Sequence, residues 1–220
     1  MSRHYASDLM LGQRFLVFGA SGGAGSAVCR EIEACSGVVA TAGHNVMLGH
    51  IPIPDERYDG IFYAAGVEVI APLLSSMDDQ PLRYATMHLE QVMHRAGAFV
   101  KPGGSIVVMS SAAAVKGTPG MVLYGAHKAF AEGLVRGAAV ELAPKRIRVN
   151  AIRAGGFPSP MHQRVTSRMS EESIKAYAAK HPLGFGTCED IAQAAVFLLS
   201  DASKWITGSI MAVDGGMGAA

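Results

Sequence analysis

The segment RFLVFGASGGAGSAVCREIEAC, residues 14–35, indicates the type of fold. It opens with a short apolar run, Arg14–Phe18, passes through the glycine-rich turn Gly19–Gly25, and continues as a helical pattern to about Cys35. A strand that leads through glycines into a helix is the start of the β-α-β unit found in parallel sheets. We therefore expect an α/β fold.

The same alternation of short apolar runs with longer helical patterns continues along the chain. The run Ser105–Ser110 is almost continuously apolar, as expected for a strand with both sheet faces covered. No repeat or interdomain linker interrupts the pattern, so residues 1–220 are expected to form one domain with a doubly wound parallel sheet of the Rossmann type. The other predicted strands are Val38–Ala42, Ile61–Ala65, Ile147–Ile152 and Ser209–Val213, and helices are predicted at Asp79–Val100, Tyr124–Ala143 and Glu189–Ser200, with a further helix inside Phe157–Lys180.

The bulk composition excludes several classes of function. Half of the 220 residues are hydrophobic, 17% are charged, and the formal net charge of +1 includes no concentrated basic face of the kind that nucleic-acid binding needs. No apolar run approaches the ~18–20 residues that cross a bilayer, and no signal sequence opens the chain. Cys29, Cys35 and Cys188 lack metal-site spacing and are expected to be thiols in a reducing compartment. We expect a cytoplasmic protein without a metal site, a membrane contact or a nucleic-acid partner.

The glycine-rich turn predicts a phosphate-binding site. Glycines let the backbone approach a pyrophosphate, and the N-terminus of the following helix offers it unpaired N–H groups and partial positive charge. The alternative is a turn that only connects a strand to a helix. The residues expected at the pyrophosphate are Gly19, Ser21, Gly22, Gly23, Ala24 and Gly25.

The residues after the second predicted strand bear on the choice of cofactor. An acidic residue about 20 positions after the loop commonly binds the adenosine ribose and selects NAD. Here the sequence Thr41-Ala42-Gly43-His44-Asn45 contains no carboxylate that would repel a ribose phosphate, and no arginine or lysine that would bind one. NADP is therefore favoured over NAD. His44 is a candidate cofactor contact, and the alternative for it is a solvated loop histidine.

A tyrosine and a lysine near the start of one predicted helix indicate acid–base chemistry. Tyr124 and Lys128 are four residues apart, so they lie on the same helix face about one turn from each other. A nearby ammonium favours the phenolate form of a tyrosine, which can then exchange a proton with a carbonyl or alcohol oxygen. Ser111 ends the preceding strand and is placed to orient that oxygen. Taken alone, the Tyr-x-x-x-Lys pair is more often an ordinary helix surface.

At these positions the sequence resembles the short-chain dehydrogenase/reductase family, and the resemblance covers nearly all of the chain. The family's Thr-Gly-x-x-x-Gly-x-Gly loop is similar to Phe18–Gly25, and its serine, tyrosine and lysine to Ser111, Tyr124 and Lys128. The resemblance implies hydride transfer between NAD(P)(H) and a small-molecule carbonyl or secondary alcohol. It also implies that Lys128 and Tyr124 contact the cofactor. Further similar segments are Val149–Gly155, His181–Gly184, Glu189–Ala192, Phe197–Ser200, Ile206–Gly208 and Val213–Gly216, and the further implied cofactor contacts are Ala64, Ala65, Gly66, Gly155 and Ser159.

Several residues depart from the family pattern. Phe18 stands in place of the loop threonine, and Tyr63-Ala64-Ala65-Gly66 replaces the family's Asn-Asn-Ala-Gly. His88, followed by the expected leucine, stands where the family has a catalytic asparagine that holds a relay water. An imidazole can donate and accept hydrogen bonds and so take over that role. The alternative for His88 is a packing histidine on a half-buried helix.

The chain is short on the side where the adenine is expected. Gly66 follows Gly25 by only 41 positions, and the residues between Gly43 and Asp59 are too few for a crossover helix, a strand and a returning helix. Pro52 and Pro54 disfavour regular structure there. We expect one reduced sheet edge made mostly of loop, with Val46–Ile51 as an irregular antiparallel edge strand. An exposed adenine cleft and weaker cofactor affinity follow, unless a second subunit or the loop itself closes the cleft.

The predicted Tyr124–Ala143 helix also suggests an assembly. It is rich in glycine and alanine, which fits either close packing on the sheet of the same subunit or contact with a second copy. The resemblance implies a homodimer or homotetramer.

Two functions remain after these considerations. The first is the oxidoreductase, for which the sequence determines neither the substrate nor the physiological direction. The second is a nucleotide-binding protein that has lost catalysis and acts as a sensor or structural partner. A sugar epimerase shares the Tyr-x-x-x-Lys pair, but the chain after Gly155 is too short for the second domain that such an enzyme needs.

Overall fold

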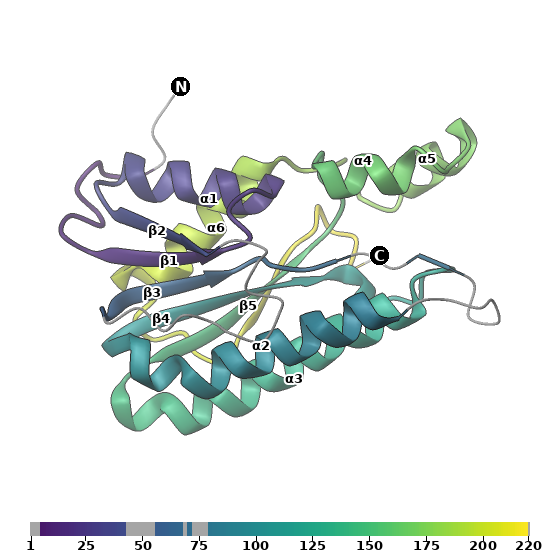
Figure 1. The fold of residues 1–220 in the computed structure, drawn as a ribbon. Coiled ribbons are helices and arrows are strands. Elements are labelled where there is room, and N and C mark those ends of the chain that lie inside the picture. Colours follow the sequence, from purple (N-terminus) through teal and green to yellow (C-terminus); the bar gives the residue numbers. More distant parts are fainter. Residues whose placement is uncertain (1–4, 43–55, 68–69, 72–78, 220) are drawn as a thin grey trace.

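The computed structural model describes residues 5–42, 56–67, 70–71 and 79–219 (Figure 1). Six parallel strands form one sheet in the order β2-β1-β3-β4-β5-β6. The predicted fold, a single doubly wound α/β domain, is confirmed. The strands are β1 (Arg14–Phe18), β2 (Val38–Ala42), β3 (Tyr58–Tyr63), β4 (Val100–Ser111), β5 (Arg148–Ala154) and β6 (Ile210–Val213). The α-helices are α1 (Gly23–Ala34), α2 (Gln80–Phe99), α3 (Val122–Leu142), α4 (Pro160–Thr166), α5 (Glu171–Ala178) and α6 (Cys188–Leu199), with short 3-10 turns η2 (Ala112–Ala114), η3 (Ala143–Lys145) and η4 (Asp201–Ser203).

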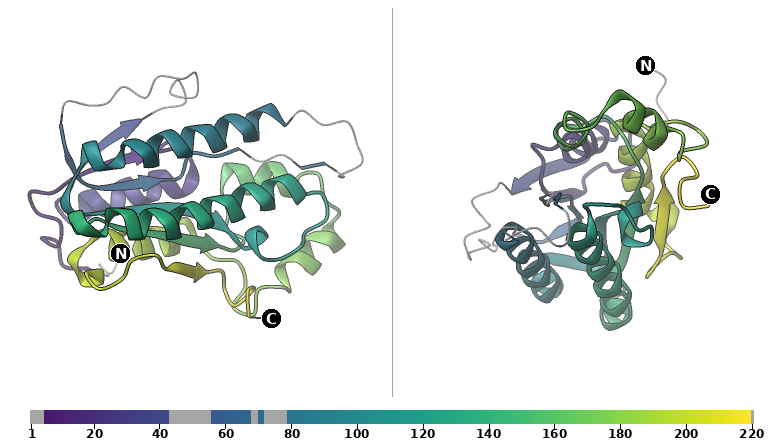
Figure 2. Two further views of the ribbon diagram at one scale, coloured as in Figure 1. Left: turned by 90° about the horizontal axis from the view of Figure 1, so that it is seen from below. Right: turned by 90° about the vertical axis from the view of Figure 1, so that its right-hand side faces the viewer.

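Helices cover both faces of the sheet. Helices α1 and α6 lie on one face, and the long helices α2 and α3 lie side by side on the other (Figures 1 and 2). Each face has its own apolar core, one built around Val28 and Val196 and the other around Leu89 and Val135. Strands β4 and β5 are therefore buried along most of their length, which explains the continuous apolar run Ile106–Met109 in β4.

Several predicted boundaries needed correction. The strand predicted at Ile61–Ala65 is Tyr58–Tyr63, because its pairing with β4 begins at Tyr58. The strand predicted at Ser105–Ser110 is Val100–Ser111, so Lys101–Gly104, between the predicted helix and strand, belongs to β4. The segment Phe157–Lys180 holds two helices rather than one, because Ser159 and Ser170 each cap a helix start with the side-chain oxygen.

The adenine-side edge is described only in part. Strand β2 is the last described strand on this side and has exposed residues such as Val38, whereas β1 next to it is buried. The expected edge strand Val46–Ile51 and its flanking loop lie outside the described residues, as does His44. The absence of covering helices there stays a prediction.

No helix in the described part of the chain combines the length and the apolar character that a membrane span requires.

Candidate active site

The predicted site residues gather at the carboxyl ends of the central strands. The turn from Gly19 to Gly22 follows β1, and Ala64, Ala65 and Gly66 follow β3. Ser111 is the last residue of β4, and Gly155 follows β5. Because all strands are parallel, these positions lie along one edge of the sheet, which is where ligands bind in open α/β folds.

Glycines in the turn after β1 allow the backbone of α1 to pack closely against the backbone of the turn. The first turn of α1 packs directly on the end of β1, since a side chain at Gly25 would place its Cβ 2.1 Å from the carbonyl oxygen of Gly19. The N-cap of α1 is Gly22, whose lack of a side chain leaves the first helical N–H groups facing the turn. These groups can bind an anion such as a pyrophosphate.

Tyr124 and Lys128 lie together on the first turns of α3. The Nζ atom of Lys128 is 5.7 Å from the centre of the Tyr124 ring, and it donates a hydrogen bond of 3.1 Å to the carbonyl oxygen of Met109 in β4. A Cβ atom at Gly66 would lie 3.6 Å from the same Nζ. The ammonium group thus sits between the ends of β3 and β4, while Tyr124 is half-buried above it.

Burial makes the charge of Lys128 costly. It lowers the pKa of Lys128 to about 8, because the surrounding protein solvates an ammonium less well than water does. Lys128 therefore stays mostly protonated at neutral pH, but it lies close to the point at which it loses its charge. A cation held next to a phenol ring favours ionisation of the phenol, which is the property that an acid–base tyrosine needs.

Ser111 lies at the end of β4, beside the N-terminal part of α3. Its side-chain oxygen caps η2 by accepting a hydrogen bond of 3.2 Å from the backbone N–H of Ala113. Gly125, the residue after Tyr124, packs against this turn so closely that a Cβ atom there would lie 2.5 Å from the Ala113 carbonyl oxygen. A glycine at this position therefore holds the helix that carries Tyr124 against the turn that follows Ser111.

The structure places His88 in an aromatic cluster with Phe18 and Tyr63, which also depart from the family pattern. The His88 Nδ1 atom is 2.8 Å from the Tyr63 hydroxyl, and the rings of Phe18, Tyr63 and His88 lie 5.6 Å from one another. Burial lowers the pKa of His88 and raises that of Tyr63, so both side chains favour the neutral form. The Nε2 atom of His88 is buried and has no hydrogen-bond partner among the described residues.

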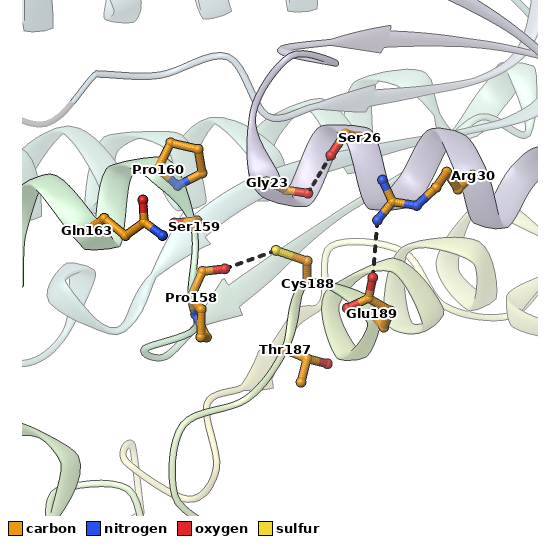
Figure 3. Close-up of a pocket in the computed structure, with 10 residues that line it drawn as sticks. All are labelled: Gly23, Ser26, Arg30, Pro158, Ser159, Pro160, Gln163, Thr187, Cys188 and Glu189. Atoms are coloured by element: carbon orange, nitrogen blue, oxygen red, sulfur yellow. Dashed lines mark hydrogen bonds and ion pairs between the residues drawn. The ribbon is translucent and has the colours of Figure 1, made fainter. Parts of the chain in front are cut away.

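The segment Gly155–Ser159 leads from β5 across to the start of α1. Ser159 caps α4, and a Cβ atom on Gly23 would lie 2.9 Å from the Ser159 Cβ. An open cavity of about 390 Å³ lies on the outer side of this contact, between α1, α4 and α6 (Figure 3). It is lined by Gly23, Ser26, Arg30, Pro158, Ser159, Pro160, Gln163, Thr187, Cys188 and Glu189.

Sequence reasoning missed a buried ion pair beside the site. Glu132, one turn after Lys128 on α3, accepts hydrogen bonds from Arg153 Nε at 2.8 Å, from Arg153 Nη2 at 2.6 Å and from Ser110 Oγ at 2.8 Å. Burial alone would raise the pKa of Glu132, but the bonds from Arg153 and Ser110 outweigh it and hold the pKa below its ordinary value. The only signal in the sequence was the spacing of Glu132 from Lys128, which places both on one helix face.

Comparisons with known proteins identify the family. The model of a family described as Enoyl-(Acyl carrier protein) reductase matches residues 59–218. The chain is 40% identical over 115 residues to a 3-oxoacyl-[acyl-carrier-protein] reductase of Thermotoga maritima, a match that covers 52% of this chain and 45% of that protein. A protein of the same name from Rickettsia bellii is 29% identical over 237 residues, covering 94% of this chain and 97% of the relative.

A solved structure supports the same assignment. A short-chain type dehydrogenase/reductase from Mycobacterium ulcerans superimposes with a TM-score of 0.80 at 26% identity, covering 96% of this chain and 91% of that one. The chain belongs to the short-chain dehydrogenase/reductase family.

The buried charge of Lys128 predicts a measurable dependence of stability on pH. In the unfolded chain a lysine titrates near ~10.4, so the folded protein binds fewer protons between about pH 8 and 10 and gains stability relative to the unfolded chain as the pH rises through this window. A shift of this size corresponds to about 3 kcal/mol at pH 7. Lys128→Met should therefore raise the free energy of unfolding at pH 7, and its advantage over the wild type should shrink towards pH 10.

Urea denaturation at pH 7, 8, 9 and 10 measures this difference. Lys175→Met on α5, which is exposed, serves as the control and should leave the difference flat. A constant stability gap between Lys128→Met and the wild type across all four pH values would contradict the buried-charge interpretation.

Proposed function

We propose that this chain is an NAD(P)-dependent oxidoreductase that transfers a hydride between the nicotinamide and a carbonyl or secondary alcohol of a small molecule. The observation that carries the proposal is the buried Lys128 ammonium, 5.7 Å from the Tyr124 ring at the edge where the glycine turn also lies. The close packing at Gly25 and the uncapped start of α1 fit a dinucleotide pyrophosphate. When bound, the nicotinamide supplies or accepts the hydride.

The side chains of this chain handle the proton. In the reductive direction, Tyr124 donates its phenolic proton to the substrate oxygen as negative charge develops there, and in the oxidative direction it accepts the proton back. Lys128 stabilises the phenolate by its charge, and it has the length to bind a cofactor ribose hydroxyl as well. Ser111 orients the substrate oxygen by a hydrogen bond from its hydroxyl group.

The choice of cofactor is proposed from the residues that follow β2, and the substrate from the relatives. NADP is favoured over NAD, because no carboxylate follows β2 to repel a ribose phosphate. The relatives named 3-oxoacyl-[acyl-carrier-protein] reductases make a 3-oxoacyl thioester the first substrate to test. A cytoplasmic location fits the three cysteines, none of which is in a disulfide bond.

Substitution of the tyrosine tests the mechanism. Tyr124→Phe removes the proton donor and keeps the ring, so the turnover number should fall by about 10²-fold or more while the Kd of NAD(P)H stays close to that of the wild type. Tyr5→Phe removes another tyrosine hydroxyl, one that donates to the backbone of Gln193 away from the site, and should leave turnover unchanged. Near-normal turnover in Tyr124→Phe would eliminate this mechanism.

His88 is proposed to connect the site to solvent in place of the family asparagine. The hydrogen bond to Tyr63 fixes the ring, and the buried Nε2 atom then has no protein partner among the described residues, which fits a relay water there. His88→Asn should keep most of the activity, whereas His88→Ala should lower turnover and change its pH profile. Tyr63→Phe, which removes the bond to Nδ1, should have an intermediate effect. If His88→Ala leaves rate and pH profile unchanged, His88 is a packing residue.

The same cluster favours the second candidate function, a nucleotide-binding protein without catalysis. It replaces polar family residues with aromatic ones at three contacting positions next to the glycine turn and on α2. Fluorescence titration with NADPH and NADH, followed by a turnover assay with the same samples, separates the two functions. Saturable binding without turnover of any carbonyl substrate would favour the sensor, and the Kd would also test the weak binding expected from the short adenine side.

We further propose that the chain forms a homodimer or homotetramer through α2 and α3. Gly125 packs inside the subunit, but a Cβ atom at Gly133 or Gly137 would meet nothing within 4 Å, so these two glycines do not serve intrasubunit packing. They belong to an exposed stripe of small and apolar residues along α3. Its members are Val122, Ala126, Ala129, Phe130, Gly133, Gly137 and Val140, and the exposed Tyr84 and Met87 extend it onto α2.

A charge placed in this stripe tests the assembly. Gly137→Glu should convert the oligomer to monomers, because a carboxylate would be buried without a partner where two helices meet closely. Lys175→Glu on the exposed face of α5 adds the same group elsewhere and should leave the mass unchanged. Light scattering after size-exclusion chromatography measures the mass, and an oligomer that persists in Gly137→Glu places the interface on another face.

A further inference from the structure

His181 is a buried histidine outside the proposed catalytic set. It follows α5, has 3% of its surface exposed, and uses both ring nitrogens in hydrogen bonds to the backbone. The Nδ1 atom lies 3.0 Å from the carbonyl oxygen of Tyr177, and the Nε2 atom lies 2.9 Å from the backbone nitrogen of Gly156. The ring therefore bridges the end of α5 to the segment that follows β5.

These two partners allow only one form of the ring. A carbonyl oxygen has no proton, so Nδ1 must carry the hydrogen that it donates to Tyr177. The backbone N–H of Gly156 is itself a donor, so Nε2 must be the unprotonated nitrogen that accepts from it. Both bonds agree on the same neutral tautomer, which is what a residue built to hold a backbone N–H requires.

Both backbone polar groups of Gly156 have hydrogen-bond partners in the loop after α5. Its N–H donates to His181, and its carbonyl oxygen accepts a bond of 3.0 Å from the N–H of Gly186. The loop that supplies both partners is anchored in turn, because Leu183 donates to the carbonyl oxygen of Gly215 and Gly184 donates to that of His181. Around it, the rings of Tyr177, His181 and Phe185 pack at centroid distances of 5.1 to 5.3 Å.

Gly156 belongs to the segment Gly155–Ser159, which reaches the N-terminus of α1, where the proposed function places the cofactor phosphates. Gly155 donates to Val213, the Cys188 thiol donates to the Pro158 carbonyl oxygen at 3.2 Å, and Ser159 lies against Gly23 (Figure 3). The segment is thus tied at its start and near its end. Between these two points, Gly156 is bonded to His181 through its N–H and to Gly186 through its carbonyl oxygen.

We propose that His181 is a positioning residue, whose Nε2 accepts a hydrogen bond from the Gly156 N–H. This bond holds the Gly155–Ser159 segment at the distance from the N-terminus of α1 that a cofactor bound there requires. This inference rests on the proposed function for the identity of the ligand, but the hydrogen bond can be tested without any ligand. The competing explanation is that His181 only fills space among the aromatic rings, in which case any side chain of similar volume would serve.

Two amide substitutions separate these explanations. In His181→Gln the side-chain oxygen can take the place of Nε2 and accept from Gly156, whereas in His181→Asn the amide reaches only as far as Nδ1, so that the bond to Tyr177 is kept and the one to Gly156 is lost. We expect the Gly156 amide to exchange with deuterium about tenfold faster in His181→Asn than in the wild type, and at a near wild-type rate in His181→Gln. Exchange of the core amides of β4 serves as the internal control.

We expect the loss of cofactor affinity in the two variants to follow the same order as the increase in amide exchange. The Kd of NADPH should rise about tenfold in His181→Asn and less than threefold in His181→Gln, while turnover at saturating cofactor stays within about threefold of the wild type in both. Equal behaviour of the two variants, in exchange and in Kd, would overturn the proposal. If the wild type binds no nicotinamide nucleotide, the proposed function fails, but the exchange result still decides whether His181 positions Gly156.

Should both variants fail to fold, the wild-type protein provides the decisive measurement. Nitrogen NMR of the histidine rings reports which nitrogen carries the proton, and a coupling across the hydrogen bond would join the Gly156 amide to His181 Nε2. A ring protonated on Nδ1 and coupled to Gly156 supports the proposal. A ring protonated on Nε2 overturns it.

Discussion

The site depends on one buried charge, the ammonium group of Lys128, held 3.1 Å from a backbone carbonyl at the end of β4. Removing a charge from water is costly unless the surroundings are arranged for it, and the pKa of about 8 shows that this cost is only partly offset. The arrangement requires α3 to lie directly on the sheet. Gly125 makes this possible at the turn after Ser111, and the pair between Glu132 and Arg153 holds the next turn of the helix to β5.

The aromatic cluster of Phe18, Tyr63 and His88 shows a second constraint, that a buried polar side chain needs a hydrogen-bond partner nearby. A single asparagine left among aromatic rings would lose hydrogen-bond partners, and each unsatisfied group would cost about 1–3 kcal/mol. Here the hydroxyl of Tyr63 satisfies one nitrogen of His88, and Phe18 packs its ring against both side chains. These three departures from the family pattern therefore contact one another, although they are widely separated in the sequence.

Polar backbone contacts organise the opposite side of the site. The loop from His181 to Gly186 brackets the peptide at Gly156, and the thiol of Cys188 contacts Pro158 farther along the same segment. The N-terminal end of α1 is thus bordered by a segment that is held by hydrogen bonds to the loop between α5 and α6 and to Cys188, the first residue of α6, rather than by apolar packing alone. Hydrogen bonds depend on both distance and angle, so they restrict the position of this segment relative to α1 more closely than apolar packing does.

The amino-acid sequence was enough to predict the fold class and to propose most residues of the candidate site. Apolar runs buried on both faces mark the parallel strands, and the spacing from Tyr124 to Lys128 places them on one helix face because a helix repeats every 3.6 residues. Which polar groups meet across the fold became visible in the three-dimensional packing alone. Glu132 and Arg153 lie on different elements, as do Tyr63 and His88, and His181 and Gly156. Such contacts arise when helices and strands are packed, and local periodicity carries no information about which distant residue will face a given side chain.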